Sequence, residues 1–81
     1  MSLRIAKLRW RARRGMRELD ALLERFIEVQ AATLSDAEIG CFEGILELPD
    51  PVLHAYLLGR SVPDDLATTV LIDRIRGSAR A

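Results

Sequence analysis

The sequence of 81 residues predicts an all-α fold, a compact single domain built as a bundle of five short helices. Apolar residues recur at helical spacing in five segments, and no stretch alternates apolar and polar residues over the length of a strand. The loops between the segments are short, so successive helices must fold back on one another. A chain of this length has room for one small domain. We expect a single helical domain over residues 1–81, with a frayed tail at 77–81.

The first two segments differ in the clarity of their apolar pattern. Residues 3–13 carry two weak stripes separated by arginines, namely Leu3/Ala6/Trp10 and Ile5/Leu8/Ala12. Residues 16–29 have the spacing of an amphipathic helix with one buried face, formed by Leu19, Leu22, Leu23, Phe26 and Ile27. Gly15 lies between the two segments, where the absence of a Cβ favours a sharp turn.

Capping residues mark the third and fourth helices. Ser35 and Glu38 have the spacing of a capping box, in which each side chain binds the backbone amide of the other residue. Asp50 is expected to be the N-cap of the fourth helix, with Pro51 at its first helical position. Gly59 is expected to end that helix.

The fifth helix follows Pro63 and has charges that suit a helix dipole. Asp64 and Asp65 are expected in its first turn, and arginines occupy its last turn before Gly77. Its apolar stripe consists of Ala67, Leu71 and Ile75, with Leu66 and Val70 beside it.

The charges are unevenly distributed, although 12 basic residues balance 12 acidic ones. Residues 1–17 carry seven basic side chains and no acid, whereas residues 18–65 carry eleven acids and two arginines. The basic segment favours either an anionic partner or packing against the acidic helices of the same chain, and both interpretations stay open. The strongly basic overall balance of a typical nucleic-acid-binding protein is absent.

The sequence holds no recognisable catalytic constellation. The only histidine, His54, and the only cysteine, Cys41, lie on different predicted helices, and neither a zinc-binding spacing nor a phosphate-binding glycine loop is present. We therefore expect a protein that is not an enzyme and binds no metal or cofactor itself. One cysteine, no secretory signal and no apolar run of membrane-spanning length predict a cytoplasmic protein without a membrane span.

The junction Arg13-Arg14-Gly15-Met16-Arg17-Glu18-Leu19-Asp20 is the most informative segment. In a purely structural interpretation, Gly15 starts the second helix, Glu18 near its third position binds free backbone amides, and Arg14 is a solvated charge. That interpretation leaves Met16 unexplained. A glycine beside an arginine that can form paired hydrogen bonds suits close docking of another protein's backbone.

This junction, with Trp10 before it and Leu34-Ser35-Asp36 and Pro49-Asp50-Pro51 after it, resembles the SdhE family over about residues 4–76. Members of that family are small assembly factors that promote covalent attachment of FAD to the flavoprotein subunit of succinate dehydrogenase. The resemblance implies a bundle of five helices, in agreement with the segments above.

The resemblance also implies which residues bind the partner. The family's RGxxE signature falls on Arg14, Gly15 and Glu18, with Met16 as a contact on the same turn. The client would be the flavoprotein subunit of succinate dehydrogenase, with the related fumarate reductase as a further candidate. FAD and the histidine that becomes attached to it would both belong to the client, which this chain would hold in a reactive arrangement.

The alternative function is a small nucleic-acid-binding or antitoxin-type interaction module. Seven basic side chains near Trp10 could bind phosphates while the indole stacks on a base. The acidic middle of the chain and the lack of a recognition helix argue against this alternative, so we do not expect nucleic acid as a partner.

Overall fold

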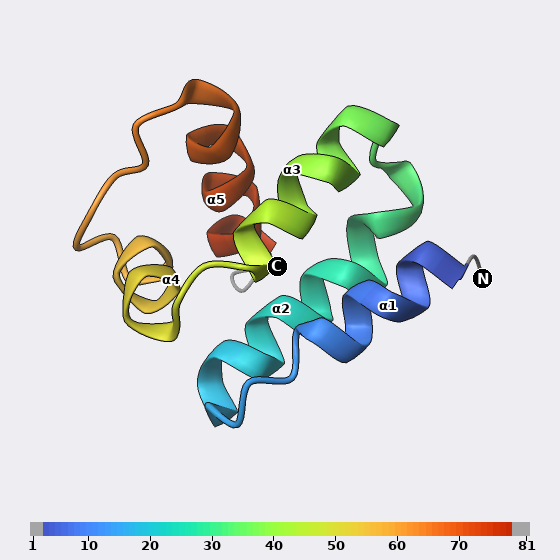
Figure 1. The fold of residues 1–81 in the computed structure, drawn as a ribbon, viewed down its shortest axis with the longest axis horizontal. Coiled ribbons are helices and arrows are strands. Elements are labelled where there is room, and N and C mark those ends of the chain that lie inside the picture. Colours follow the sequence, from blue (N-terminus) through green and yellow to red (C-terminus); the bar gives the residue numbers. More distant parts are fainter. Residues whose placement is uncertain (1–2, 79–81) are drawn as a thin grey trace.

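Five α-helices and one short 3₁₀ helix form the structure, a computed structural model that describes residues 3–78. The elements are α1 (Leu3–Arg11), α2 (Arg17–Gln30), the 3₁₀ helix η1 (Ala31–Thr33), α3 (Asp36–Leu46), α4 (Asp50–Leu57) and α5 (Leu66–Ser78) (Figure 1). No strand occurs within the described range. The prediction of an all-α bundle of five helices is therefore confirmed.

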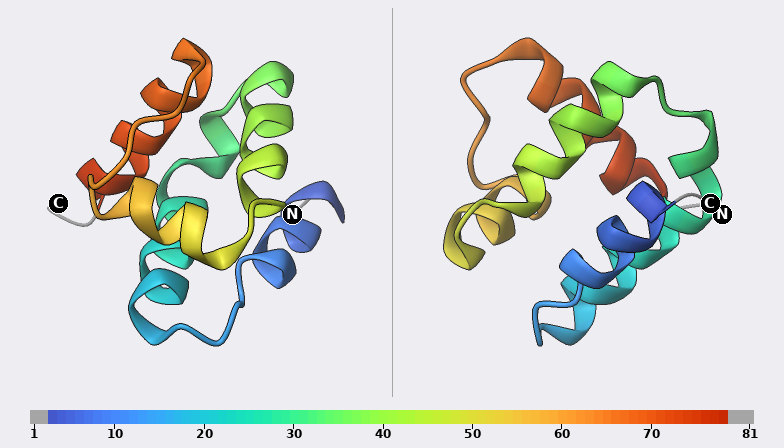
Figure 2. Two further views of the ribbon diagram at one scale, coloured as in Figure 1. Left: turned by 60° about the vertical axis from the view of Figure 1, so that its left-hand side comes forward. Right: turned by 45° about the vertical axis from the view of Figure 1, so that its right-hand side comes forward.

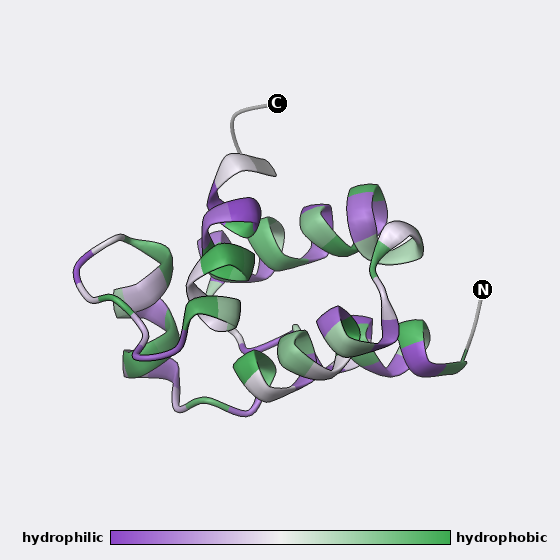
Figure 3. Cartoon of the chain, turned by 90° about the horizontal axis from the view of Figure 1, so that it is seen from above, coloured by the Kyte–Doolittle hydropathy of each residue, from purple (hydrophilic) through white to green (hydrophobic). Residues whose placement is uncertain are grey.

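The helices pack as a bundle in which α5 contacts three others. α1 and α2 lie side by side and run in opposite directions, joined by a short turn (Figures 1 and 2). α5 packs against α2, α3 and α4. Hydrophobic and hydrophilic residues alternate along the turns of the helices, as expected for amphipathic helices that share one core (Figure 3).

The core is lined by a buried face from every α-helix. The rings of Phe26 on α2 and Phe42 on α3 are both fully buried, with centroids 5.2 Å apart and planes inclined by 59°. Leu53 of α4 and Ile75 of α5 are also inaccessible to solvent. Burial of each such side chain contributes about 1.5–3 kcal/mol, and these contacts hold together helices that are too short to be stable alone.

Only one of the two stripes on α1 faces the core. Leu8 and Ala12 are buried and Ile5 packs partly against them, whereas Leu3 and Trp10 are 73% and 77% exposed. The helix also ends at Arg11 rather than at Arg13 as predicted, because the chain turns tightly there before Gly15.

The ends of α4 and α5 differ in detail from the predicted ones. Pro49, not Asp50, is the N-cap of α4, and Asp50 is its first residue. Asp65 precedes α5 rather than lying in its first turn, and its carboxylate accepts hydrogen bonds from the backbone amide and hydroxyl of Thr68. α5 continues through Gly77, so part of the predicted tail is helical, and residues 79–81 lie outside the described residues.

Part of the basic N-terminal segment packs against acidic α3. Arg4 binds Glu43 at 2.9 Å, and Arg11 lies 3.9 Å from Glu47. The hydrogen bond from Arg4 is the main cause that lowers the pKa of Glu43. On this side of α1, the interpretation that the basic segment packs against acidic helices of the same chain is therefore correct for Arg4 and Arg11.

The end of α4 is in direct contact with the end of α5. Gly59 follows α4 with a φ of +75°, a conformation that glycine adopts without strain. A Cβ at this position would lie 2.8 Å from Nη2 of Arg76, whose guanidinium covers the glycine. The last turns of the two helices therefore constrain each other.

The capping box of α3 predicts a pH-dependent stability. Glu38 accepts a hydrogen bond from the Ser35 amide at 2.8 Å and binds Arg74 at 2.6 Å, while the Ser35 hydroxyl accepts from the Glu38 amide. Hydrogen bonds with Ser35 are the largest causes that hold the pKa of Glu38 below its usual 4.5. The carboxylate therefore stabilises the fold above pH 4.5, and this contribution is lost as pH falls through the lowered pKa.

We expect Glu38→Gln to lower the melting temperature most at neutral pH, with the difference from wild type shrinking below pH 4.5. Circular-dichroism melts over a pH series measure this, with Asp73→Asn, at an exposed carboxylate on α5, as the matched charge control. A difference that stays constant on acidification would contradict the assignment.

Candidate functional site

The turn between α1 and α2 is held by a carboxylate from the first turns of α2. Asp20 accepts a hydrogen bond from the Arg14 amide at 2.9 Å with one oxygen and from the Gly15 amide at 3.1 Å with the other. Gly15 has a φ of +81°, a conformation costly for any residue with a Cβ. The turn is therefore a fixed structure in the free protein.

Arg14 ties this turn to the link between α3 and α4. Its Nη1 donates to the backbone oxygen of Leu48 at 2.9 Å and to Oδ1 of Asp50 at 2.8 Å. The Arg14 side chain is only 13% exposed, so the interpretation of Arg14 as a solvated charge is wrong. The same contact engages the Asp50 carboxylate, which makes no capping hydrogen bond to α4.

Gly15 and Glu18 lie at the surface of the turn. Apart from Gly15 and its two chain neighbours, no atom of the described residues lies within 4 Å of the place where a Cβ of Gly15 would be, so the backbone is open to close approach. Glu18 is exposed, and within residues 3–78 its side chain makes no hydrogen bond or ion pair. The prediction that Glu18 caps the turn is wrong, because α2 starts after Met16 as N-cap and Asp20 binds the amides instead.

Met16 lines an open groove between the start of α2 and the end of α4. Its side chain is half-buried and packs against the core. The groove has a volume of about 610 Å³ and is lined by Met16, Arg17, Glu18, Leu19, Leu22, His54, Leu57 and Leu58. The role of Met16 was not explained by the local sequence, and the structure places its side chain in the same groove as Glu18.

The α4 wall of this groove was not predicted from the sequence. His54 and Leu58, which is 46% exposed, were not among the expected site residues. No signal in the local sequence could have paired them with Met16, because the groove forms between segments almost forty residues apart. The groove offers apolar contacts together with one carboxylate, one guanidinium and one imidazole, from Glu18, Arg17 and His54.

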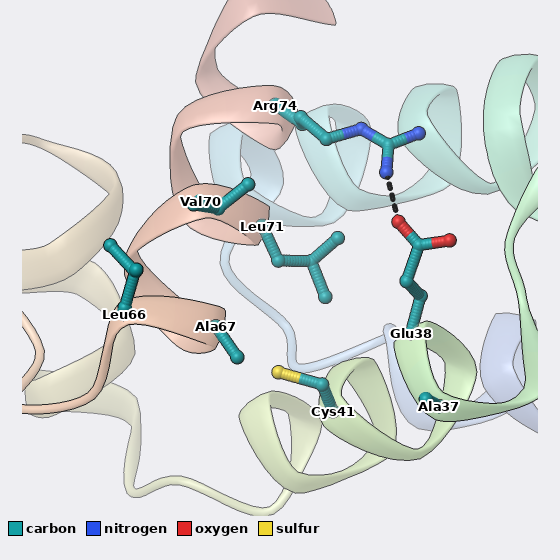
Figure 4. Close-up of a pocket in the computed structure, with 8 residues that line it drawn as sticks. All are labelled: Ala37, Glu38, Cys41, Leu66, Ala67, Val70, Leu71 and Arg74. Carbon is teal, nitrogen blue, oxygen red and sulfur yellow. Dashed lines mark hydrogen bonds and ion pairs between the residues drawn. The ribbon is translucent and has the colours of Figure 1, made fainter.

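A second hollow between α3 and α5 is mainly apolar and holds none of the RGxxE residues (Figure 4). Its volume is about 520 Å³, and the Cys41 thiol and the Glu38–Arg74 ion pair are its polar groups. Within residues 3–78, no cluster of three or more His, Cys, Asp or Glu side chains could hold a metal ion. No helix in this range is long and apolar enough to cross a membrane.

The geometry of the turn makes Asp20 a testable structural residue. We expect Asp20→Ala to lower the free energy of unfolding by about 1–3 kcal/mol, because two amides lose a charged acceptor. Hydrogen exchange at the Arg14 and Gly15 amides should accelerate more than exchange in the middle of α2. Chemical denaturation and NMR exchange measure both effects, with exposed Glu24→Ala on the same helix as control. Unchanged exchange at the two amides would contradict this role.

Comparison with known proteins identifies the family of this chain. Residues 6–79 match the family described as Sdh5, flavinator of succinate dehydrogenase. The FAD assembly factor SdhE of Coxiella burnetii is 43% identical over 70 residues, covering 86% of this chain and 85% of the relative. The SdhE of Xylella fastidiosa is 46% identical over 86% of this chain and 72% of its own length. That of Shewanella oneidensis is 39% identical over 93% and 92% of the two chains. The chain therefore belongs to the Sdh5 family of succinate dehydrogenase flavinators.

Proposed function

We propose that this protein is an assembly factor that binds the flavoprotein subunit of succinate dehydrogenase and promotes covalent attachment of FAD to a histidine of that subunit. The observation that carries the proposal is the exposed Gly15–Glu18 turn, which is held rigid by Asp20 and Arg14 in a chain of this family. A turn already fixed in the free protein binds without the entropy cost of ordering a loop.

The residues of the turn have different roles in this proposal. Gly15 admits the client backbone, and Glu18 offers a carboxylate without an intrachain partner to a client cation or amide. Met16 and the groove beside it receive an apolar client side chain. Arg14 acts as a positioning residue, since Leu48 and Asp50 already occupy its Nη1.

The assembly factor acts on the client's conformation rather than on the bond being formed. FAD and the reactive histidine both belong to the client, and this chain binds no cofactor itself in the proposal. In one arrangement of the client, the flavin and the histidine are aligned for reaction. The factor binds this arrangement with higher affinity than the others and so increases its population. Each 1.4 kcal/mol of such preference raises the population about tenfold.

The proposal also covers the range of clients and the cellular compartment. The client range includes the related fumarate reductase, and the protein acts in the cytoplasm. Flavin attachment to each purified apo-flavoprotein, with and without this chain, tests the client range directly.

Gly15→Arg should abolish flavin attachment while the helices remain folded. The substitution adds backbone strain of about 1–2 kcal/mol but meets open space in the free protein. Gly15→Ala has the same strain with only a methyl group, so it separates strain from obstruction of the partner. In-gel flavin fluorescence of the apo-subunit measures attachment, and circular dichroism checks the fold. Normal attachment with Gly15→Arg would refute the role of the turn.

Glu18→Ala should reduce flavin attachment without reducing stability. Its side chain is exposed and unpaired within the described range, so the free energy of unfolding should change by less than about 0.5 kcal/mol. Glu28→Ala, also exposed on α2, is the matched control for loss of a negative charge. Equal attachment rates for the two variants would remove Glu18 from the docking surface.

A further inference from the structure

Trp10 stands exposed on the outer side of α1, next to the proposed docking turn. The indole is 77% exposed, and it lines two adjoining hollows of about 560 Å³ and 330 Å³. A large apolar side chain in this position gains nothing from the core of its own chain. Tryptophan and arginine are the residue types that most often dominate binding at protein interfaces.

The surroundings of Trp10 are predominantly basic. The two hollows contain four cationic side chains and two carboxylates, namely Lys7, Arg11, Arg13 and Arg14 with Glu47 and Asp50. Both carboxylates already face arginines of this chain, at 3.9 Å for Arg11 and 2.8 Å for Arg14. Within residues 3–78, Lys7 and Arg13 form no ion pair. Four cations against two carboxylates therefore leave a net positive charge around the indole, although the charge of Lys7 also acts on Glu43 of α3, whose pKa it helps to lower.

This charge pattern fits an acidic protein surface better than a nucleic acid. Two cations outside ion pairs are few for a phosphate backbone, since affinity for nucleic acid depends on neutralising many phosphates at once. Glu47 and Asp50 face Arg11 and Arg14, which leaves Arg13 as the cation of that hollow outside an ion pair among the described residues. A protein can place single carboxylates next to Lys7 and Arg13. A protein partner can also cover the indole with apolar side chains and so desolvate it.

We infer that the Trp10 face of α1 is a second docking surface, which binds an apolar patch edged with carboxylates on the same flavoprotein that contacts the Gly15 turn. This inference rests on the proposed function. The turn connects the two surfaces directly, because Arg14 lines the Trp10 hollow and Met16 lines the groove at α2 and α4. Trp10 supplies affinity, while the Gly15–Glu18 turn sets the conformation of the client.

The test measures binding of the purified apo-flavoprotein subunit to the full-length chain by calorimetry. Trp10→Ala should raise the dissociation constant about tenfold or more. Leu66→Ala, at an equally exposed residue (78%) that starts α5, is the matched control and should bind like wild type. The double variant Lys7→Gln/Arg13→Gln should bind more weakly at low salt and lose much of the salt dependence. Melting temperatures verify that each variant is folded.

The rate of flavin attachment at different concentrations of the factor provides a second test. A purely structural role of Trp10 would not produce the expected dependence on concentration. Trp10→Ala should slow attachment at limiting concentration of the factor and recover the wild-type rate when the factor is in excess, because affinity alone is lost. Failure to recover at saturating concentration would overturn a role confined to docking.

The other outcomes separate this inference from the proposed function. If wild type binds the flavoprotein and Trp10→Ala binds equally well, the inference fails and the proposed function stands. If wild type does not bind the flavoprotein at all, both fail. Single-stranded and duplex oligonucleotides form the last arm: salt-sensitive binding that requires Trp10 would overturn the assignment of this face to a protein.

Discussion

The hydrogen bonds of Arg14 are the constraint on which the rest of the structure depends. The Arg14 guanidinium joins the turn between α1 and α2 to the link between α3 and α4, where it binds Leu48 and Asp50. Asp20 fixes the same turn from the other side through its backbone amides. Because the side chain of Arg14 fixes the turn, the other residues of the RGxxE signature can be exposed and still have a defined conformation. The surface contribution of the RGxxE signature thus comes from its glycine and glutamate.

The sequence predicted the fold well because the fold rests on local patterns. The stripe of α2 and the Ser35–Glu38 capping box are encoded within a few residues, and both are present in the structure. One of the failed predictions has its cause in a distant part of the chain. Asp50 was expected to cap α4, but Arg14, thirty-six residues earlier, engages its carboxylate. Helix ends depend on such long-range contacts, which single-sequence patterns do not record.

The candidate site could be predicted only in part. A glycine between two helical patterns indicated a turn, and resemblance to a family indicated its importance. Neither could show that Asp20 holds the turn, or that His54 and Leu58 form the far wall of the groove beside Met16. The exposure of Trp10 could not be predicted either, because the two apolar stripes of α1 have the same spacing in the sequence. Which stripe packs inward is decided by tertiary contacts with α2 and α3.

The contact between Gly59 and Arg76 links the far end of the chain to the groove. Because the Arg76 guanidinium covers Gly59, the final turns of α5 brace the segment of α4 that carries Leu57 and Leu58. A C-terminus shortened before this arginine would free the α4 wall to shift while most of the core stayed intact.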